Sequence, residues 1–255
     1  VSINASAATA SFADANVGTN KAVTVSGYAL AGSNAGNYTL TQPSGLTASI
    51  TAKTLTISGT SIASKVYDGT TTATINSSAA TFSGKVSNDS LSLTGGTGGF
   101  ASKNVGTGIT VTVSNLTLGG ADAGNYNVVG GTPSFSGTAN ITVKSLTITA
   151  GAQTKTYDGT TTVSSNTAYN VTGLVGNETI SSVTLAYTDK NAGAGNKTIA
   201  VGNAVAGANT TLSNYNILYT NSTNSSITTK TLTVTASAQT KTYDGGTGVA
   251  SNTAF

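Results

Sequence analysis

The chain has 255 residues and a net charge of +3, and only 7% of its residues are charged, against about 25% in an ordinary soluble domain. It contains no Cys, His, Met or Trp, which excludes thiolate and imidazole metal sites, disulfides, and Ser-His-Asp or Cys-His catalysis. The lysines are spread along the chain and form no basic stripe for nucleic acid, and no apolar run is long enough to insert into a membrane. We therefore expect a non-enzymatic protein without catalytic, cofactor-binding or metal-binding residues.

In chain order, the expected elements are short strands separated by turns. Alternation of polar and apolar residues predicts half-buried strands at residues 22–26, 110–114, 145–149 and 231–235. Turn dipeptides such as Asp68-Gly69 follow one another at short intervals between the strands. The best candidate for a helical turn is Gly-Ala-Asp-Ala-Gly-Asn-Tyr at residues 120–126, and helical periodicity is otherwise absent.

Four landmarks recur in one order with a period of about 88 residues, which indicates internal repeats. They are Tyr-Asp-Gly, an aromatic residue four positions before an Asn, Asn-Tyr, and a Thr-Leu-Thr-Ile type of segment that follows a lysine. The aromatic landmark pairs Phe12, Phe100 and Tyr187 with Asn16, Asn104 and Asn191. The landmarks with candidate functional side chains are Tyr67-Asp68-Gly69, Tyr157-Asp158-Gly159 and Tyr243-Asp244-Gly245, and Asn37-Tyr38, Asn125-Tyr126 and Asn214-Tyr215.

The repeats divide the chain into modules. Residues 1–53 correspond to the C-terminal part of a truncated module, residues 54–144 and 145–230 to two complete modules, and residues 231–255 to the start of a further one. No linker rich in Pro or charge separates them, so we expect stiffly coupled neighbours. The predicted fold is all-β, a tandem array of β-sandwich-like modules. A β-grasp-like module with one short helix is the alternative, and a parallel β-helix is less favoured because no shorter period is visible.

Tyr-Asp-Gly can be interpreted in two ways. A buried Tyr or Asp with a shifted pKa could serve as an acid or base. Asp-Gly is also among the strongest β-turn dipeptides, and the Tyr ring would then pack under the turn. Three copies at one period favour the turn. Lys65, Lys155 and Lys241 precede the Tyr by two positions and are expected to pair with the Asp or to protect a strand edge.

Asn-Tyr has two interpretations as well. The amide and the ring could face a polysaccharide. We favour a structural role, in which Asn takes a turn conformation and Tyr begins the next strand.

Taken together, the motifs resemble the YDG-type repeat domain. The resemblance rests on Lys-x-Tyr-Asp-Gly-Thr-Thr, on Phe-x-x-Lys-Asn-Val-Gly-Thr-Gly at residues 100–108, on Leu-x-Gly-Ala-Asp-Ala-Gly-Asn-Tyr at residues 118–126, and on Ile-Thr-x-Lys at residues 141–144. Residues 145–230 depart from this pattern, with Asn-Ala-Gly-Ala-Gly at 191–195 and Thr-Thr-Leu-Ser-Asn-Tyr at 210–215. Such repeats, and the related MBG repeats, occur in large bacterial secreted adhesins, many of them filamentous-haemagglutinin-like proteins exported by two-partner secretion.

The resemblance implies a function outside the cell and no enzymatic activity. We expect a repeat stalk of a bacterial surface or secreted adhesin that projects adhesive regions and supports cell adhesion or biofilm formation. Its partners would be neighbouring repeats, and extracellular polysaccharide or a host surface. A polysaccharide-binding module and a self-associating matrix filament are the alternatives.

Overall fold

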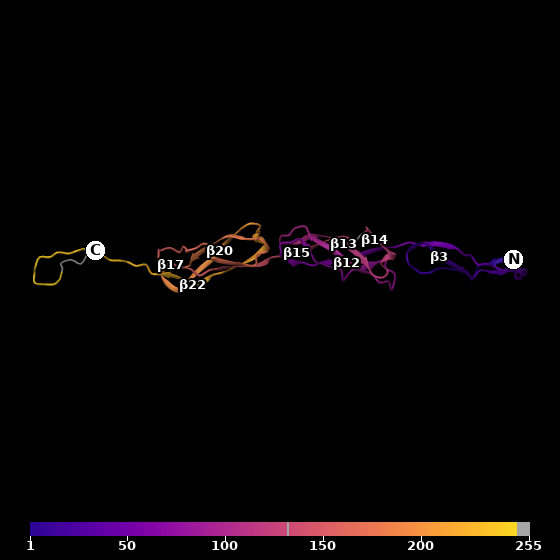
Figure 1. Ribbon diagram of the computed structural model, residues 1–255, viewed down its shortest axis with the longest axis horizontal. Helices are drawn as coiled ribbons and strands as arrows, with labels where there is room; N and C mark the ends of the chain where they lie inside the picture. The colour runs from indigo at the N-terminus through magenta and orange to yellow at the C-terminus, as the bar shows by residue number, and fades with distance from the viewer. Residues whose placement is uncertain (132, 249–255) are drawn as a thin grey trace. The chain divides into compact units, whose positions relative to one another are not determined.

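The computed structural model describes residues 1–131 and 133–248, and in them the regular structure is β-strand with three short 3₁₀ turns (Figure 1). The chain divides into two compact units, Val1–Thr142 and Val143–Phe255. Within the described residues, no helix is long and apolar enough to cross a membrane. The prediction of an all-β fold is therefore confirmed.

The described part of the first unit contains fifteen strands and two 3₁₀ turns. They are β1 (Ser2–Asn4), β2 (Thr9–Phe12), β3 (Gly18–Ser26), β4 (Ala29–Ala31), η1 (Ala35–Asn37), β5 (Leu46–Ile50), β6 (Lys53–Ser58), β7 (Ser61–Ile62), β8 (Lys65–Val66), β9 (Thr72–Ala73), β10 (Ile75–Asn76), β11 (Thr81–Ser83), β12 (Ser92–Phe100), β13 (Gly106–Gly119), η2 (Ala123–Asn125), β14 (Tyr126–Val128) and β15 (Phe135–Thr142).

The described part of the second unit contains seven strands and one 3₁₀ turn. They are β16 (Lys144–Ala150), β17 (Thr154–Thr156), β18 (Tyr169–Thr172), β19 (Ile180–Tyr187), β20 (Gly193–Ala206), η3 (Leu212–Asn214), β21 (Tyr215–Thr220) and β22 (Ser222–Thr228).

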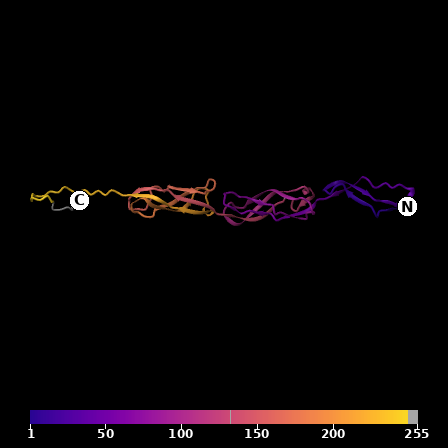
Figure 2. The same ribbon diagram turned by 90° about the horizontal axis from the view of Figure 1, so that it is seen from below.

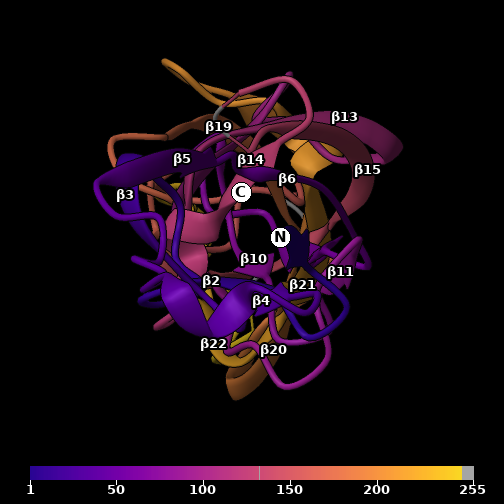
Figure 3. The ribbon, with the colours of Figure 1, turned by 90° about the vertical axis from the view of Figure 1, so that its right-hand side faces the viewer.

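Residues 53–142 form a module of two larger sheets and one short two-stranded sheet, β10-β7. One larger sheet has the order β11-β6-β14 and the other the order β8-β15-β13-β12-β9. Neighbouring strands are antiparallel except for β6 with β14 and β8 with β15, which are parallel; Figure 3 shows β14 beside β6. Apolar side chains of both sheets meet in one core, where Leu55, Val111, Val113 and Ile141 are almost completely buried.

Residues 144–228 repeat this plan. The sheets β18-β16-β21 and β17-β22-β20-β19 again contain two parallel pairs, β16 with β21 and β17 with β22. The strands of this module run alongside one another in two views (Figures 1 and 2). Its core contains Leu146, Ile148, Ile199 and Ile227, all almost fully buried.

The two modules fill their cores with different side chains. Strand β12 is rich in glycine, and a Cβ atom at Gly96 would lie 2.6 Å from the Leu116 side chain, closer than carbon atoms can approach. In β19 the positions that correspond to glycines of β12 hold the larger residues Val183 and Leu185, and both of these side chains are buried. A large residue on one strand is thus matched by a small one on its neighbour, as close packing requires.

Residues 1–50 form sheets without a buried core. Strands β2, β3 and β5 pair in one sheet and β1 with β4 in another, and no residue of this segment is fully buried. By the repeat alignment, β2, β3 and β5 correspond to the end of β12, to β13 and to β15. The segment thus contains counterparts of β12, β13 and β15, and none of β6, β8 or β14.

Most of the expected elements are present and one is not. The strands at residues 22–26, 110–114 and 145–149 lie in β3, β13 and β16, and the helical turn at 120–126 is η2. The strand expected at residues 231–235 is absent, so that prediction is wrong. A strand needs a hydrogen-bonded neighbour, and in the structure this segment lies beside no other strand.

Candidate functional site

The Lys-x-Tyr-Asp-Gly segment folds into a turn around its own lysine. Gly69 has a φ of 76°, a left-handed conformation that glycine adopts without strain. The Asp68 Oδ1 atom accepts hydrogen bonds from the backbone N–H and the hydroxyl of Thr70, both at 2.9 Å. The Lys65 Nζ atom donates to the same Oδ1 at 2.7 Å. The Asp therefore closes the turn and at the same time binds the lysine.

The lysine ammonium is surrounded by oxygen atoms of the turn. Lys65 Nζ also donates to the carbonyl oxygens of Thr70 at 2.8 Å and Thr72 at 2.9 Å. Its fourth neighbour is the ring of Phe100, whose centroid lies 5.4 Å from Nζ, within the range of a cation–π interaction. We call this arrangement of Lys65, Asp68, Thr70, Thr72 and Phe100 the lysine clasp.

Part of the clasp recurs at the other two Tyr-Asp-Gly positions, where the lysine again donates to the Asp and to the carbonyl two residues after it. Lys155 donates to Asp158 and to the Thr160 carbonyl, each at 2.8 Å, and lies 5.5 Å from the Tyr187 ring. Lys241 donates to Asp244 at 2.6 Å, and to the carbonyls of Gly246 and Gly248. This third copy lies outside any sheet, so the turn is determined by its own sequence.

The clasp keeps its aspartate charged. The hydrogen bond from Lys155 is the main cause that lowers the pKa of Asp158 to about 2, and the backbone and hydroxyl of Thr160 add to it. Burial would raise the pKa of Asp68, but the hydrogen bonds from Lys65 and Thr70 outweigh it and lower that pKa below its ordinary value. A carboxylate held in this way is a poor proton acceptor at neutral pH. The hydrogen bonds of the Asp therefore support the interpretation of Tyr-Asp-Gly as a turn.

The three Tyr residues of the motif differ in exposure. Tyr67 is 1% exposed, Tyr157 is 37% exposed and Tyr243 is 93% exposed. In the two complete modules the backbone is placed alike, because Tyr67 N–H donates to the Thr142 carbonyl and Tyr157 N–H to the Thr228 carbonyl, both at 2.9 Å. The ring is thus buried at one of the three positions.

The Asn-Tyr landmark fixes a distant loop. Each Asn ends a 3₁₀ turn, and in both complete modules the following Tyr begins a strand and is buried. The Tyr126 hydroxyl accepts a hydrogen bond from Val86 N–H at 2.8 Å and donates one to Asp89. Tyr215 repeats this with Val175 N–H at 3.0 Å and with Glu178. The pKa of Tyr126 is raised by burial and by the hydrogen bond to Asp89.

The side chain of Asn125 joins two modules within the first unit. Its Oδ1 accepts a hydrogen bond from Val17 N–H at 2.9 Å, and its Nδ2 donates to Asn16 Oδ1 at 3.2 Å. Asn16 is the Asn of the aromatic landmark, so two landmarks of successive repeats meet here. A polar groove of about 280 Å³ lies beside this contact, and Lys53, Asp122 and Asn125 are among its lining residues.

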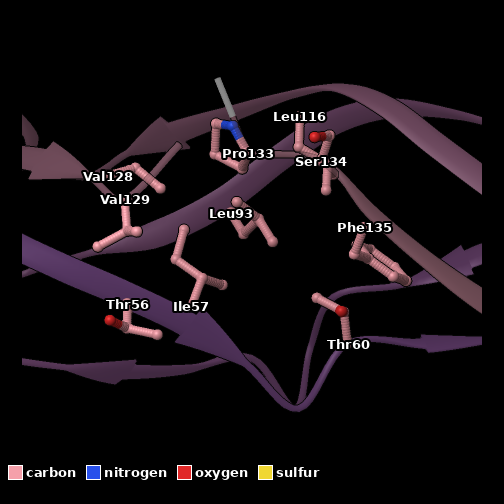
Figure 4. A pocket seen from close by; sticks show the side chains of 10 residues that line it. All are labelled: Thr56, Ile57, Thr60, Leu93, Leu116, Val128, Val129, Pro133, Ser134 and Phe135. Carbon is pink, nitrogen blue, oxygen red and sulfur yellow. The ribbon is translucent and has the colours of Figure 1, made fainter. Parts of the chain in front are cut away.

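An apolar pocket lies between the two sheets of residues 53–142. Its volume is about 160 Å³, and Figure 4 shows the side chains that line it. The apolar ones are Ile57, Leu93, Leu116, Val128, Val129, Pro133 and Phe135. Among the described residues, its polar side chains are the hydroxyls of Thr56, Thr60 and Ser134, so these residues line a gap in apolar packing without a charged group.

All eight acidic residues of the chain contribute to local structure. Five aspartates form ion pairs with lysines: Asp14, Asp68, Asp158, Asp189 and Asp244. The other three accept hydrogen bonds: Asp89 from Tyr126, Glu178 from Tyr215 and Asp122 from the Ser90 N–H. In the described part of the chain no three His, Cys, Asp or Glu residues gather as metal ligands would.

Fold and site together define an array of all-β modules, and each of the two complete ones contains a clasped turn and a buried Tyr that holds a loop. The chain belongs to the YDG domain family, whose model matches it three times in tandem, at residues 1–45, 51–134 and 142–224. No curated protein and no solved structure matches the chain.

Proposed function

We propose that the chain is a segment of a non-enzymatic repeat stalk in a large bacterial surface or secreted adhesin. In this role it acts outside the cell, projects adhesive regions away from the surface and supports cell adhesion or biofilm formation. The observation that carries the proposal is that every carboxylate and both Asn-Tyr tyrosines of the complete modules are engaged in holding the fold. The groups that could perform chemistry are instead used to keep each module rigid.

Two further features support a stalk. Only Val143 lies between β15 and β16, so the connection leaves little room for a flexible linker. The YDG domain occurs three times in tandem in this chain. An array of repeats gains length as copies are added, because each copy contacts only its nearest neighbours. A module of this size spans about 40 Å, so reach grows in proportion to copy number.

Small-angle X-ray scattering on the full chain tests the stalk. The expected result is an elongated particle whose longest dimension equals the sum of the module lengths, about 40 Å for each complete module. A compact globule would rule the stalk out.

Polysaccharide binding is the second candidate, and the polar groove beside Asn125 is the observation that favours it. Amide, carboxylate and ammonium groups line this groove, and sugars are bound by such groups. The Asn-Tyr rings are buried in both complete modules, which counts against them as a sugar-binding face. A glycan array probed with the full chain and with Lys53→Ala tests this. Binding that is weakened by the substitution supports the groove, and the absence of binding eliminates it.

A further inference from the structure

The two complete modules differ at one position between their sheets. In residues 144–228, Tyr219 of β21 pairs with Ile148 of β16, and the Tyr219 hydroxyl accepts a hydrogen bond from the Ala204 N–H of β20 at 2.9 Å. Because β21 and β20 belong to different sheets, the Tyr219 side chain reaches from one sheet to the other. The chain itself thus supplies an aromatic ring to the space between β20 and β21.

Residues 53–142 have no ring at this position. The Asn-Tyr landmark aligns Gly130 with Tyr219. The chain turns away after Val128, because the Gly131 N–H donates to the Val128 carbonyl at 3.0 Å. Gly130 has a φ of 86°, a conformation that a residue with a side chain rarely adopts. Gly130 therefore contributes no side chain to this space, and the apolar pocket is found here, with Val128 in its wall.

Ile57 marks the same place in the pocket. It is the counterpart of Ile148, which pairs with Tyr219. Ile148 is completely buried, whereas Ile57 is only partly buried and lines the pocket. Figure 4 shows the Ile57 side chain at the centre of the lining residues, below Leu93 in the view. The pocket therefore occupies the space that Tyr219 fills in the other module.

Leu116 lines the pocket from the other sheet. Its counterpart is Ala204, because each of them follows an Asn with a left-handed φ, 58° at Asn115 and 49° at Asn203. Both Asn side chains also donate to the hydroxyl of a Thr on the neighbouring strand. Leu116 is larger than Ala204 and takes up part of the space of the missing ring, and the pocket is the part that stays empty.

The size and lining of the pocket suit a single aromatic ring. An apolar cavity of about 150 Å³ binds benzene, and this pocket has a volume of about 160 Å³. Its apolar side chains would cover the ring, and the hydroxyls of Thr56, Thr60 and Ser134 are hydrogen-bond partners for one hydroxyl group. No charged residue is among the described residues that line it, so a charged ligand would lose its hydration there without gaining a partner.

We propose that this pocket binds a phenolic ring, in the place that Tyr219 fills in the other module. The chemistry of the ligand is one aromatic ring with one hydroxyl group, supplied either by a small free phenol or by the tyrosine side chain of a partner. The site goes beyond the stalk, because it gives residues 53–142 a ligand that residues 144–228, with a ring of their own, cannot take.

A titration of the isotope-labelled full chain with p-cresol, followed by NMR, tests the proposal. This compound is the side chain of tyrosine without its backbone. We expect one equivalent to bind, with saturable shifts at the amides of residues 55–58, 91–95 and 126–129. Val128→Phe places a ring in the pocket and is expected to weaken binding by about tenfold or more, because the space is then filled. Ile217→Phe is the matched control, since Ile217 is the counterpart of Val128, and it is expected to leave binding unchanged.

Two further ligands need no variant, so they test the site even if a substitution prevents folding. Para-hydroxybenzoate has a carboxylate in place of the methyl group of p-cresol and is expected to cause no shifts at the pocket, because its charge would be buried without a partner. N-acetyltyrosinamide carries the same ring on a peptide backbone. Shifts with it at the same amides would identify a tyrosine side chain as the ligand, and shifts with p-cresol alone would identify a free phenol. Both outcomes support a phenolic site.

Tyr219→Ala tests the equivalence of the two modules. The substitution removes the ring from residues 144–228 and with it the partner of the Ala204 N–H, so p-cresol is expected to bind as a second equivalent and to shift amides of β16 and β21. The absence of saturable shifts at the pocket of the wild type would overturn the proposal. Equal binding of para-hydroxybenzoate, or binding that Val128→Phe leaves unchanged, would overturn it too. A Tyr219→Ala chain without a second site would contradict the assignment of the ligand from Tyr219.

Discussion

At the scale of single residues, the lysine-bound aspartates make the stability of the fold sensitive to acid. The pKa values of Asp14, Asp68, Asp158, Asp189 and Asp244 are all lowered, and that of Asp158 falls to about 2 from an ordinary value of 3.8. A carboxyl with a lower pKa in the folded state than in the unfolded state stabilises the fold above the unfolded pKa. This contribution is lost as the pH falls through the folded pKa.

Urea unfolding between pH 6 and pH 2 tests this link. We expect the free energy of unfolding to be nearly constant above the ordinary carboxyl pKa of 3.8, and to decrease between that value and about 2, the pKa of Asp158. Asp158→Asn is expected to make this decrease smaller, because one titrating group is lost. Lys155→Met removes the main cause of the shift and is expected to make the decrease smaller too. A pH dependence that neither substitution alters would show that the clasp does not couple to folding.

At the scale of elements, the Tyr126 hydroxyl ties the start of β14 to the loop before β12. Tyr126→Phe removes the acceptor of the Val86 N–H and the donor to Asp89 while keeping the ring. Because a partly buried N–H then lacks its partner, we expect a loss of about 1–3 kcal/mol in the free energy of unfolding.

Thermal unfolding measured by circular dichroism provides the comparison. Tyr215→Phe is expected to act like Tyr126→Phe, because the Tyr215 hydroxyl has the same two kinds of partner. Tyr38→Phe is the control, and since Tyr38 is exposed, it is expected to unfold as the wild type does. Equal effects of all three substitutions would show that the hydrogen bonds of the Tyr126 and Tyr215 hydroxyls do not contribute to the stability of the fold.

The sequence predicts turns and strands well, but it predicts less well which strands pair with each other. Asp-Gly turns depend on neighbouring residues, and so the turn at Asp68-Gly69 was visible in the sequence and is present at all three copies. The parallel pairing of β6 with β14 joins residues far apart in the chain, and alternation of polar and apolar residues says which face of a strand is buried but not which strand lies beside it. The hydrogen bond from Tyr126 to Asp89 cannot be predicted from the sequence for the same reason.

The missing strand at residues 231–235 shows this limit most clearly. Its sequence alternates as in β16, yet it forms no strand, because the neighbours that β16 has in β18 and β21 have no counterpart beside it. The same dependence on neighbours explains why Tyr243 is exposed whereas Tyr67 is buried. The sequence of a repeat specifies the module only where the whole module is present.

At the scale of the whole molecule, stability is expected to be uneven along the chain. The fully buried residues lie between Leu55 and Ile227, and the described residues before and after this range include none. Amide hydrogens exchange through local opening, whose free energy depends on how much packing is lost. We therefore expect fast exchange in residues 1–50 and 230–248, and slow exchange in β13 and β20.

Hydrogen exchange followed by mass spectrometry measures this distribution on the full chain. The two end segments are expected to exchange much faster than β13 and β20, because their backbone hydrogen bonds are not covered by a packed core. Val111→Ala, which removes two methyl groups from a fully buried position of β13, is expected to speed exchange in β13 while β20 stays unchanged. Equally slow exchange in the end segments and in β13 and β20 would contradict an uneven stability along the chain.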